Sequence, residues 1–184
     1  TGDTVRMKGN NSNGFSKSTS SYNKFQMTGK IGASGNIMSL LYGDDFEGKI
    51  TIPCVCCFYD MFEGCTSLTT APTLHAMTLT DSCYSGMFSG CTSLTKAPEL
   101  PATTLERYCY SNMFEGCTSL TTAPAWPATT LANNCYSVMF NGCTSLVKAP
   151  VLPATTLASN CYSSMFNGCT SLVKAPVLPA TTLA

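Results

Sequence analysis

Twelve cysteines are the residues of this 184-residue chain best suited to chemistry, because a thiolate can bind a metal, attack an electrophile or form a disulfide. Cys54, Cys56 and Cys57 form the tightest cluster. A structural zinc site usually needs two ligand pairs separated by a loop, and no second pair is free in this sequence. The sequence therefore predicts neither a metal site nor a cofactor.

Ten of the twelve cysteines recur at one constant interval in two series, at apolar positions of a repeated pattern. The series are Cys57, Cys83, Cys109, Cys135 and Cys161, and Cys65, Cys91, Cys117, Cys143 and Cys169. Neighbours within a series could approach disulfide distance, about 4.4–6.8 Å between Cα atoms. Because each series has five members, pairing would leave an orphan in each. Small, buried, free thiols are the favoured interpretation.

The other ionisable side chains form no recognisable catalytic set. His75 is the only histidine and stands where the other units have proline, which indicates a divergent turn. Paired carboxylates can perform acid–base chemistry or bind calcium, but their spacing here fits no calcium loop and favours solvated turns. The two acidic clusters are Asp44, Asp45 and Glu47, and Asp60 and Glu63. We therefore predict no catalytic residues and no enzyme activity.

The elements that position these residues are set by an internal repeat. The dipeptide Met-Phe occurs five times with the same separation, which defines a 26-residue unit. Its copies begin at Met61, Met87, Met113, Met139 and Met165. A single unit cannot bury its apolar residues alone, so stacked units and a solenoid fold are expected.

Each unit divides into two predicted elements, which makes the expected fold class an α/β repeat solenoid. Leu131, Cys135 and Met139 recur at i, i+4 and i+8, which favours one face of a short helix. A threonine of 129–130 could cap it, and Gly142 stands where a left-handed stop is expected. The following C-T-S-L-x-x-A-P is too short for a helix and predicts a strand in a parallel ladder.

The two ends of the array differ. Residues 1–56 do not fit the period, and we expect them to form a β-rich N-terminal cap with strands near 5–8, 24–27 and 50–52. Residues 57–184 form the array of about five units. It ends at Ala184 in mid-pattern, which we interpret as truncation rather than as an end that binds a partner.

Charge and hydropathy exclude some classes of partner. Only 11% of the residues are charged, and ten basic residues balance ten acidic ones. A nucleic-acid groove or a patch for anionic membranes needs a basic excess. No stretch approaches the roughly 20 apolar residues of a membrane span. The chain opens at Thr1 without a signal-peptide pattern, as it also would after processing.

The unit M-F-x-G-C-T-S-L-x-x-A-P-x-L-P-A-T-T-L resembles the BspA-like leucine-rich repeats in surface proteins of gut and oral bacteria, especially Bacteroides relatives. Phe88, Cys91, Leu94, Ala97, Leu100 and Pro101 correspond to the family pattern F-x-x-C-x-x-L-x-x-I-x-I-P, with Ala97 and Pro98 replacing its first isoleucine and the next residue. The resemblance covers 57–184 and, less specifically, 35–41. It implies a leucine-rich-repeat fold, export, display at the cell surface in association with the outer membrane, and adhesive binding.

Positions that vary between near-identical units are candidates for specific recognition. One such column immediately precedes the Ala-Pro pair: Thr70, Lys96, Thr122, Lys148 and Lys174. A second contains Thr73, Glu99, Ala125, Val151 and Val177. Trp126, the single tryptophan, replaces a leucine of the other units; it is either a partly exposed hot spot beside the lysines or a larger core residue.

The expected function is a secreted or cell-surface binding module for adhesion to a host or bacterial surface protein or glycan. The alternative is a structural spacer or assembly segment of a larger surface protein. Near-identity of the last units supports the alternative, because duplicated units lengthen a rod without new contacts.

Overall fold

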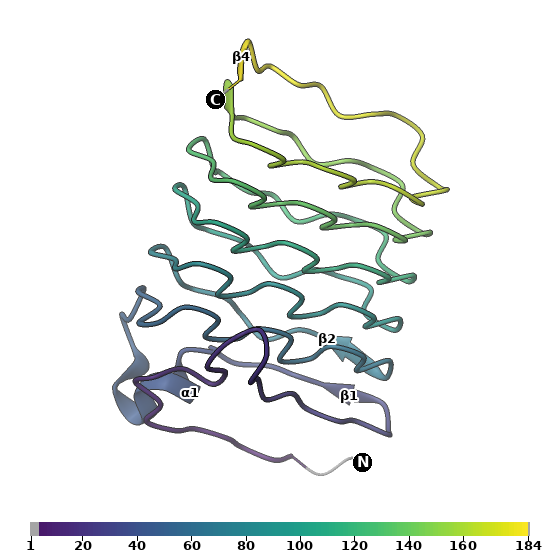
Figure 1. Ribbon diagram of the computed structural model, residues 1–184. Helices are drawn as coiled ribbons and strands as arrows, with labels where there is room; N and C mark the ends of the chain where they lie inside the picture. The colour runs from purple at the N-terminus through teal and green to yellow at the C-terminus, as the bar shows by residue number, and fades with distance from the viewer. Residues whose placement is uncertain (1–3, 184) are drawn as a thin grey trace.

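The computed structural model describes residues 4–183, so Thr1 and Ala184, on which the expectations about the chain ends rest, lie outside that range. Figure 1 shows the chain winding into successive coils that stack from the N-terminal segment at the bottom to the last coil at the top. Neighbouring coils run in the same direction. Lys96 pairs in parallel with Thr122, and Thr122 with Lys148, so one repeat unit of the sequence corresponds to one coil.

Short parallel pairings join the coils at two places. Strand β2 (Leu68–Thr70) lies in the C-T-S-L-x-x-A-P stretch, where the sequence predicts a strand, although most coils contribute only a single bridge there. The second place is the Thr-Thr pair, which the sequence analysis gave to a helix cap. There β3 (Thr156–Leu157) pairs with β4 (Thr182–Leu183), and Thr104 bridges to Thr130.

The helix predicted in each unit is wrong. The segment that contains Leu131, Cys135 and Met139 is a run of turns in which every fourth residue is left-handed: φ is 58° at Asn134 and 61° at Val138. Left-handed residues at this interval cannot belong to a right-handed helix. The prediction failed because a four-residue turn brings the same apolar residues to one side as a helical turn of about 3.6 residues does.

The left-handed glycines predicted at the end of this segment are confirmed, with φ between 68° and 74°. They are Gly64, Gly90, Gly116, Gly142 and Gly168. Rather than stopping a helix, each supplies the third left-handed step of its coil, after steps four and eight positions earlier. We call this part of each coil the turn ribbon; its five copies span 56–64, 82–90, 108–116, 134–142 and 160–168.

The backbone hydrogen bonds show what the turn ribbon achieves that a helix cannot. Every second N–H donates within its own coil, to the carbonyl three positions earlier, as Met87 does to Tyr84 at 3.2 Å. The N–H groups between them donate to the next coil, as Phe88 does to Met113 at 3.0 Å. An α-helix would use all these donors internally. The turn ribbon leaves half of them to join one coil to the next.

Two columns of stacked aromatic rings fill the interior. Within each column the ring centroids lie 5.5–5.9 Å apart and the planes are within 12° of parallel. One column is Phe58, Tyr84, Tyr110, Tyr136 and Tyr162, and the other is Phe62, Phe88, Phe114, Phe140 and Phe166. Such pairs contribute about 0.5–1.5 kcal/mol each beyond the area they bury.

The N-terminal segment is not the β-rich cap predicted for residues 1–56. In its described part, strand β1 (Ile31–Gly32) pairs with β2, and α1 (Ser39–Tyr42) leads into the 3-10 helix η1 (Gly43–Phe46). The stretches at 5–8 and 24–27 form no strand, and the third predicted strand provides only a bridge from Thr51 to Thr78. The prediction failed at 24–27 and 50–52 because Phe25 and Ile50 form their backbone hydrogen bonds with the array, to Met61 and from Met77 and Thr78.

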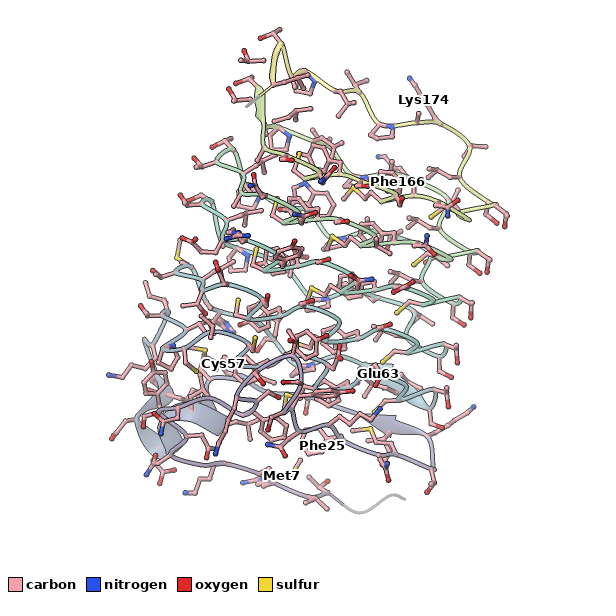
Figure 2. All side chains as sticks on the ribbon, in the orientation of Figure 1. Met7, Phe25, Cys57, Glu63, Phe166 and Lys174 are labelled. Atoms are coloured by element: carbon pink, nitrogen blue, oxygen red, sulfur yellow. The ribbon has the colours of Figure 1, made fainter. Side chains whose placement is uncertain are left out.

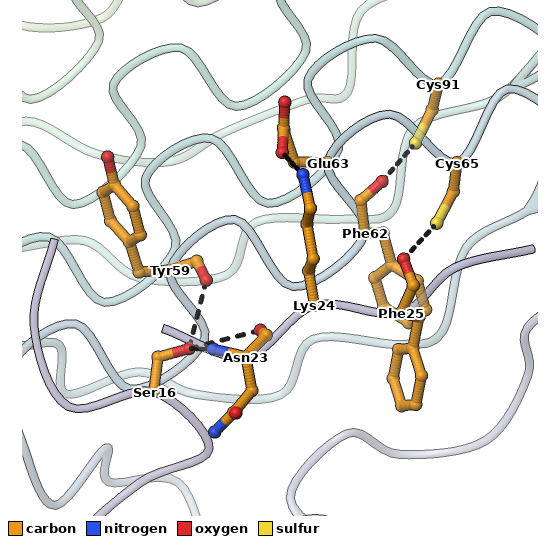
Figure 3. Close-up of polar contacts among 9 residues, drawn as sticks. All are labelled: Ser16, Asn23, Lys24, Phe25, Tyr59, Phe62, Glu63, Cys65 and Cys91. Carbon is orange, nitrogen blue, oxygen red and sulfur yellow. Dashed lines mark hydrogen bonds and ion pairs between the residues drawn. The ribbon is translucent and has the colours of Figure 1, made fainter. Parts of the chain in front are cut away.

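Phe25 nevertheless covers the first coil and makes the same contacts with it that Phe62 makes with the second coil (Figure 3). Its N–H donates to the Met61 carbonyl at 2.8 Å, and its ring lies 5.2 Å from that of Phe62. Its own carbonyl accepts the thiol proton of Cys65 at 3.2 Å, just as the Phe62 carbonyl accepts that of Cys91 at 3.1 Å. Phe25 therefore extends both the backbone ladder and the aromatic column by one step.

Ser16 completes the cap. It is fully buried, and its Oγ donates to the carbonyl of Tyr59 at 3.2 Å. The N–H groups of Phe15 and Ser16 both donate to the carbonyl of Cys57, at 2.9 and 3.0 Å. The carbonyls of Cys57, Tyr59 and Met61 in the first coil thus accept hydrogen bonds from this segment.

Candidate binding surface

The predicted column of variable residues lies on the outside of the stack. All five members are exposed: Thr70, Lys96, Thr122, Lys148 and Lys174. Three consecutive members are joined directly, because Lys96, Thr122 and Lys148 form parallel bridges from coil to coil. The structure therefore brings these residues together as one row along the solenoid, and Figure 2 shows Lys174 on the outside of the last coil.

Trp126 does not join this row. Only 6% of its surface is exposed, and its ring stacks on Tyr136 at 4.7 Å and on Phe140 at 6.0 Å. The prediction of a partly exposed hot spot is wrong, and the alternative of a larger core residue describes its position. The physical reason is its place in a column whose members in the two adjacent coils, Leu100 and Leu152, are buried as well.

A shallow hollow of about 340 Å³ opens beside Trp126, between its own coil and the preceding one. Its wall is apolar, formed by Leu100, Pro101 and Pro127, with Glu99 at its edge. Small-molecule sites combine an apolar cavity with several convergent polar groups. Glu99 is the only charged residue of this lining, so the hollow provides shape without a set of groups to orient a ligand.

Four valines are exposed on this surface, and of these only Val151 and Val177 belong to a column singled out from the sequence. Val147, Val151, Val173 and Val177 are 48%, 81%, 82% and 73% exposed. Val173 donates its N–H to the carbonyl of Val147 at 3.3 Å, so the two pairs belong to adjacent coils. Comparison of the units shows where the valines replace other residues. The position of Val147 is threonine in the three earlier units, and that of Val151 is Thr73, Glu99 or Ala125.

These valines and the two last lysines form what we call the Val–Lys face. It consists of Val147, Lys148, Val151, Val173, Lys174 and Val177. Lys148 and Lys174 are the only charged side chains after Glu115, so this part of the surface is basic and otherwise uncharged. Exposed apolar side chains gathered in one patch mark interaction sites in soluble proteins.

The buried cysteines act as hydrogen-bond donors. Each thiol of the second series donates to a phenylalanine carbonyl of the preceding coil, as Cys117 does to Phe88 and Cys143 to Phe114, both at 3.1 Å. All twelve cysteines are free thiols. Burial raises the pKa of the Cys83 and Cys91 thiols to about 12. Since the thiolate is the reactive form, these side chains are structural.

One member of each predicted acidic cluster forms an ion pair with a lysine. Lys8 Nζ lies 2.7 Å from Asp44 Oδ1, and Lys24 forms an ion pair with Glu63. Asp60 is half-buried, and burial together with the neighbouring Glu63 carboxylate raises its pKa to about 6. Within residues 4–183, no group of three or more His, Cys, Asp or Glu side chains is arranged to hold a metal ion.

His75 is exposed and belongs to none of these clusters. No helix of the described chain is long and apolar enough to cross a membrane. Comparison of the chain with protein-family models, with curated proteins and with solved structures found no match. The functional argument therefore depends on the surface itself.

Proposed function

We propose that this chain is a non-enzymatic binding module of leucine-rich-repeat type, displayed at the cell surface or secreted, and that it recognises a protein through the Val–Lys face. The observation that carries the proposal is the exposure of four valines around two lysines on coils joined by backbone hydrogen bonds. Exposed β-branched side chains on a rigid support lose little entropy when a partner covers them.

The same face favours a protein over a glycan as the partner. Carbohydrate rings are commonly bound by stacking on aromatic side chains, and the Val–Lys face contains none. Valines fit an apolar protein surface, and the two lysines fit carboxylates at its edge. A spacer role is the second candidate, because the regular ladder of coils is suited to holding another domain at a distance.

A binding screen in reducing buffer tests the proposal. The purified chain is presented to a panel of extracellular-matrix proteins and to a glycan array. We expect a saturable protein ligand whose affinity falls at least about tenfold when Val147, Val151, Val173 and Val177 are all changed to threonine. Threonine is found at these positions in earlier coils, so the fold is expected to persist. The matched control changes exposed Val5 and Val55 to threonine.

A ligand unaffected by the four valine changes would place recognition elsewhere on the surface. Binding to glycans alone would contradict the choice of partner. An absence of binding on both arrays would favour the spacer role.

A further inference from the structure

Cys54 departs from the repeat where the N-terminal segment meets the first coil. The equivalent positions of the later units are Thr80, Glu106, Ala132 and Ala158. Cys57, three positions further on, belongs to the first cysteine series, so only the first coil has the pattern Cys-x-x-Cys at this place. Two cysteines can form a disulfide when the backbone brings their Cα atoms to about 4.4–6.8 Å.

The backbone between the two cysteines is a tight turn. Residues 55–57 are turn residues, and in the second coil the corresponding turn is closed by the Cys83 N–H, which donates to the Thr80 carbonyl at 3.2 Å. The first and fourth Cα atoms of such a turn lie less than about 7 Å apart. The turn therefore brings Cys54 and Cys57 within reach of each other.

Gly14 of the N-terminal segment shows where the Cys54 sulfur lies. A Cβ atom added to Gly14 would be 2.5 Å from Cys54 Sγ and 3.2 Å from Cys57 Cα, so the sulfur and the Cys57 backbone lie beside the same point. Burial raises the pKa of the Cys57 thiol, and the adjacent Cys54 thiol raises it further through its charge and a hydrogen bond. Cys54 is partly exposed, whereas Cys57 is fully buried. A reagent in solution therefore reaches Cys54 first.

We propose that Cys54 and Cys57 are a dithiol pair that a low-molecular-weight disulfide converts into an intramolecular disulfide. The Cys54 thiolate attacks one sulfur of the reagent, so that a mixed disulfide forms and a first thiol leaves. The Cys57 thiol then loses its proton to water, and its sulfur attacks the Cys54 sulfur and releases a second thiol. Two protein thiols are thereby oxidised to one disulfide, while the reagent is reduced to two thiols that take up the two protons. Because Cys57 is buried, the second step limits the rate.

This disulfide lies where the N-terminal segment is attached to the array. The Cys57 carbonyl accepts hydrogen bonds from the N–H groups of Phe15 and Ser16, at 2.9 and 3.0 Å. The Cys54 carbonyl accepts one from Thr80 Oγ1 of the second coil at 2.6 Å. Oxidation therefore crosslinks the turn to which both neighbours are bonded. The pair is separate from the Val–Lys face, which lies on later coils.

Thiol trapping on the native chain tests the proposal. The folded chain is equilibrated with oxidised glutathione, quenched with acid, unfolded and alkylated, and its peptides are identified by mass spectrometry. We expect one disulfide per chain, between Cys54 and Cys57, and alkylation of all the other cysteines. Treatment with dithiothreitol before the quench should restore alkylation of all twelve.

Variants that copy the other coils identify the two partners. Cys54→Ala introduces the residue found at Ala132 and Ala158, and the disulfide should be lost completely. Cys56→Ser is the matched control, because Ser82 occupies the same left-handed position in the next coil, and the disulfide should form as in the parent. Circular dichroism reports that both variants are folded.

Three results would overturn the proposal. The first is a disulfide that persists in Cys54→Ala or disappears in folded Cys56→Ser, since either would make Cys56 a partner. The second is a glutathione adduct that remains on Cys54 without closing the ring. The third is a folded chain whose twelve cysteines all stay reduced after prolonged incubation with oxidised glutathione.

Discussion

At the scale of single residues, the turn ribbon demands left-handed backbone at positions where side chains are disfavoured. The middle step of the ribbon is taken by Asp60, Gly86, Asn112, Val138 and Ser164, with φ between 51° and 63°. Glycine and asparagine adopt this region readily, whereas a β-branched side chain is a genuine outlier there. Val138 is the one β-branched residue among these five, so the protein tolerates backbone strain at that position.

Replacing Val138 with asparagine should therefore stabilise the protein. We expect the free energy of unfolding to rise by about 1 kcal/mol, because strain of this kind costs about 1–3 kcal/mol and some apolar contact is lost. Urea denaturation of parent and variant measures the change. Val173→Asn, at an exposed position where φ is not positive, is the control and should change little. A destabilised Val138→Asn variant would contradict the left-handed assignment.

Asp60 gives the stability a distinct pH dependence. Its pKa is raised from 3.8 to about 6, first by burial and then by the Glu63 carboxylate. Between about pH 4 and pH 6 the folded chain keeps a proton that the unfolded chain has lost, so the free energy of unfolding falls as pH rises through this window. Above pH 6 the full cost of the buried charge remains.

Asp60→Asn should remove that cost while keeping a residue that tolerates φ of 51°. The stability of the variant relative to the parent is expected to grow from pH 4 to pH 6 and then to level off. Denaturation midpoints at each pH measure the difference. Asp45→Asn, at an exposed position, serves for comparison. A difference that is independent of pH would mean that Asp60 titrates normally.

At the scale of elements, the buried columns decide which substitutions the coils accept. Trp126→Leu restores the residue found at Leu100 and Leu152, so we expect a folded protein with binding through the Val–Lys face intact. Trp126→Ala should lower the free energy of unfolding by about 3–5 kcal/mol, the usual cost of truncating a buried aromatic residue. Thermal denaturation and the binding assay together test this. Loss of ligand binding in a stable Trp126→Leu variant would restore Trp126 as a recognition residue.

The sequence predicted the columns well and the elements poorly. The constant period of the repeat was sufficient to predict that both cysteine series are buried, apart from the half-buried Cys169, and that Gly142 and its equivalents are left-handed. It could not separate helix from turn ribbon, because Leu131, Cys135 and Met139 satisfy both. The difference lies in where alternate N–H groups find acceptors, and those acceptors belong to the next coil, a full repeat unit away along the chain.

The candidate site was predicted in part, for a related reason. The row of Lys96, Lys148 and Lys174 varies between units and is exposed, so comparison of the units located it. The same comparison contained the replacement of threonine by Val147 and Val173, which becomes meaningful only when their exposure is known. Trp126 was ambiguous because the sequence does not say on which side of the coil a leucine position lies.

At the scale of the whole molecule, the stability of the array and the arrangement of its lateral face share one cause. Each coil is held by its neighbours through the alternate N–H groups, with Phe25 and Ser16 completing the ladder at one end. Stability in such arrays is a sum over neighbouring interfaces. The two coils of the Val–Lys face are joined in the same way, by the bond from the Val173 N–H to the Val147 carbonyl.

The backbone bonds between coils are therefore the central claim, and NMR couplings across hydrogen bonds test them most directly. In a uniformly labelled sample, the amide nitrogens of Phe88 and Phe114 should couple to the carbonyl carbons of Met113 and Met139, one coil further on. A helix would instead couple Phe88 to Tyr84, four positions earlier. Couplings to the next coil would establish the ladder, and coupling of Phe88 to Tyr84 would contradict it.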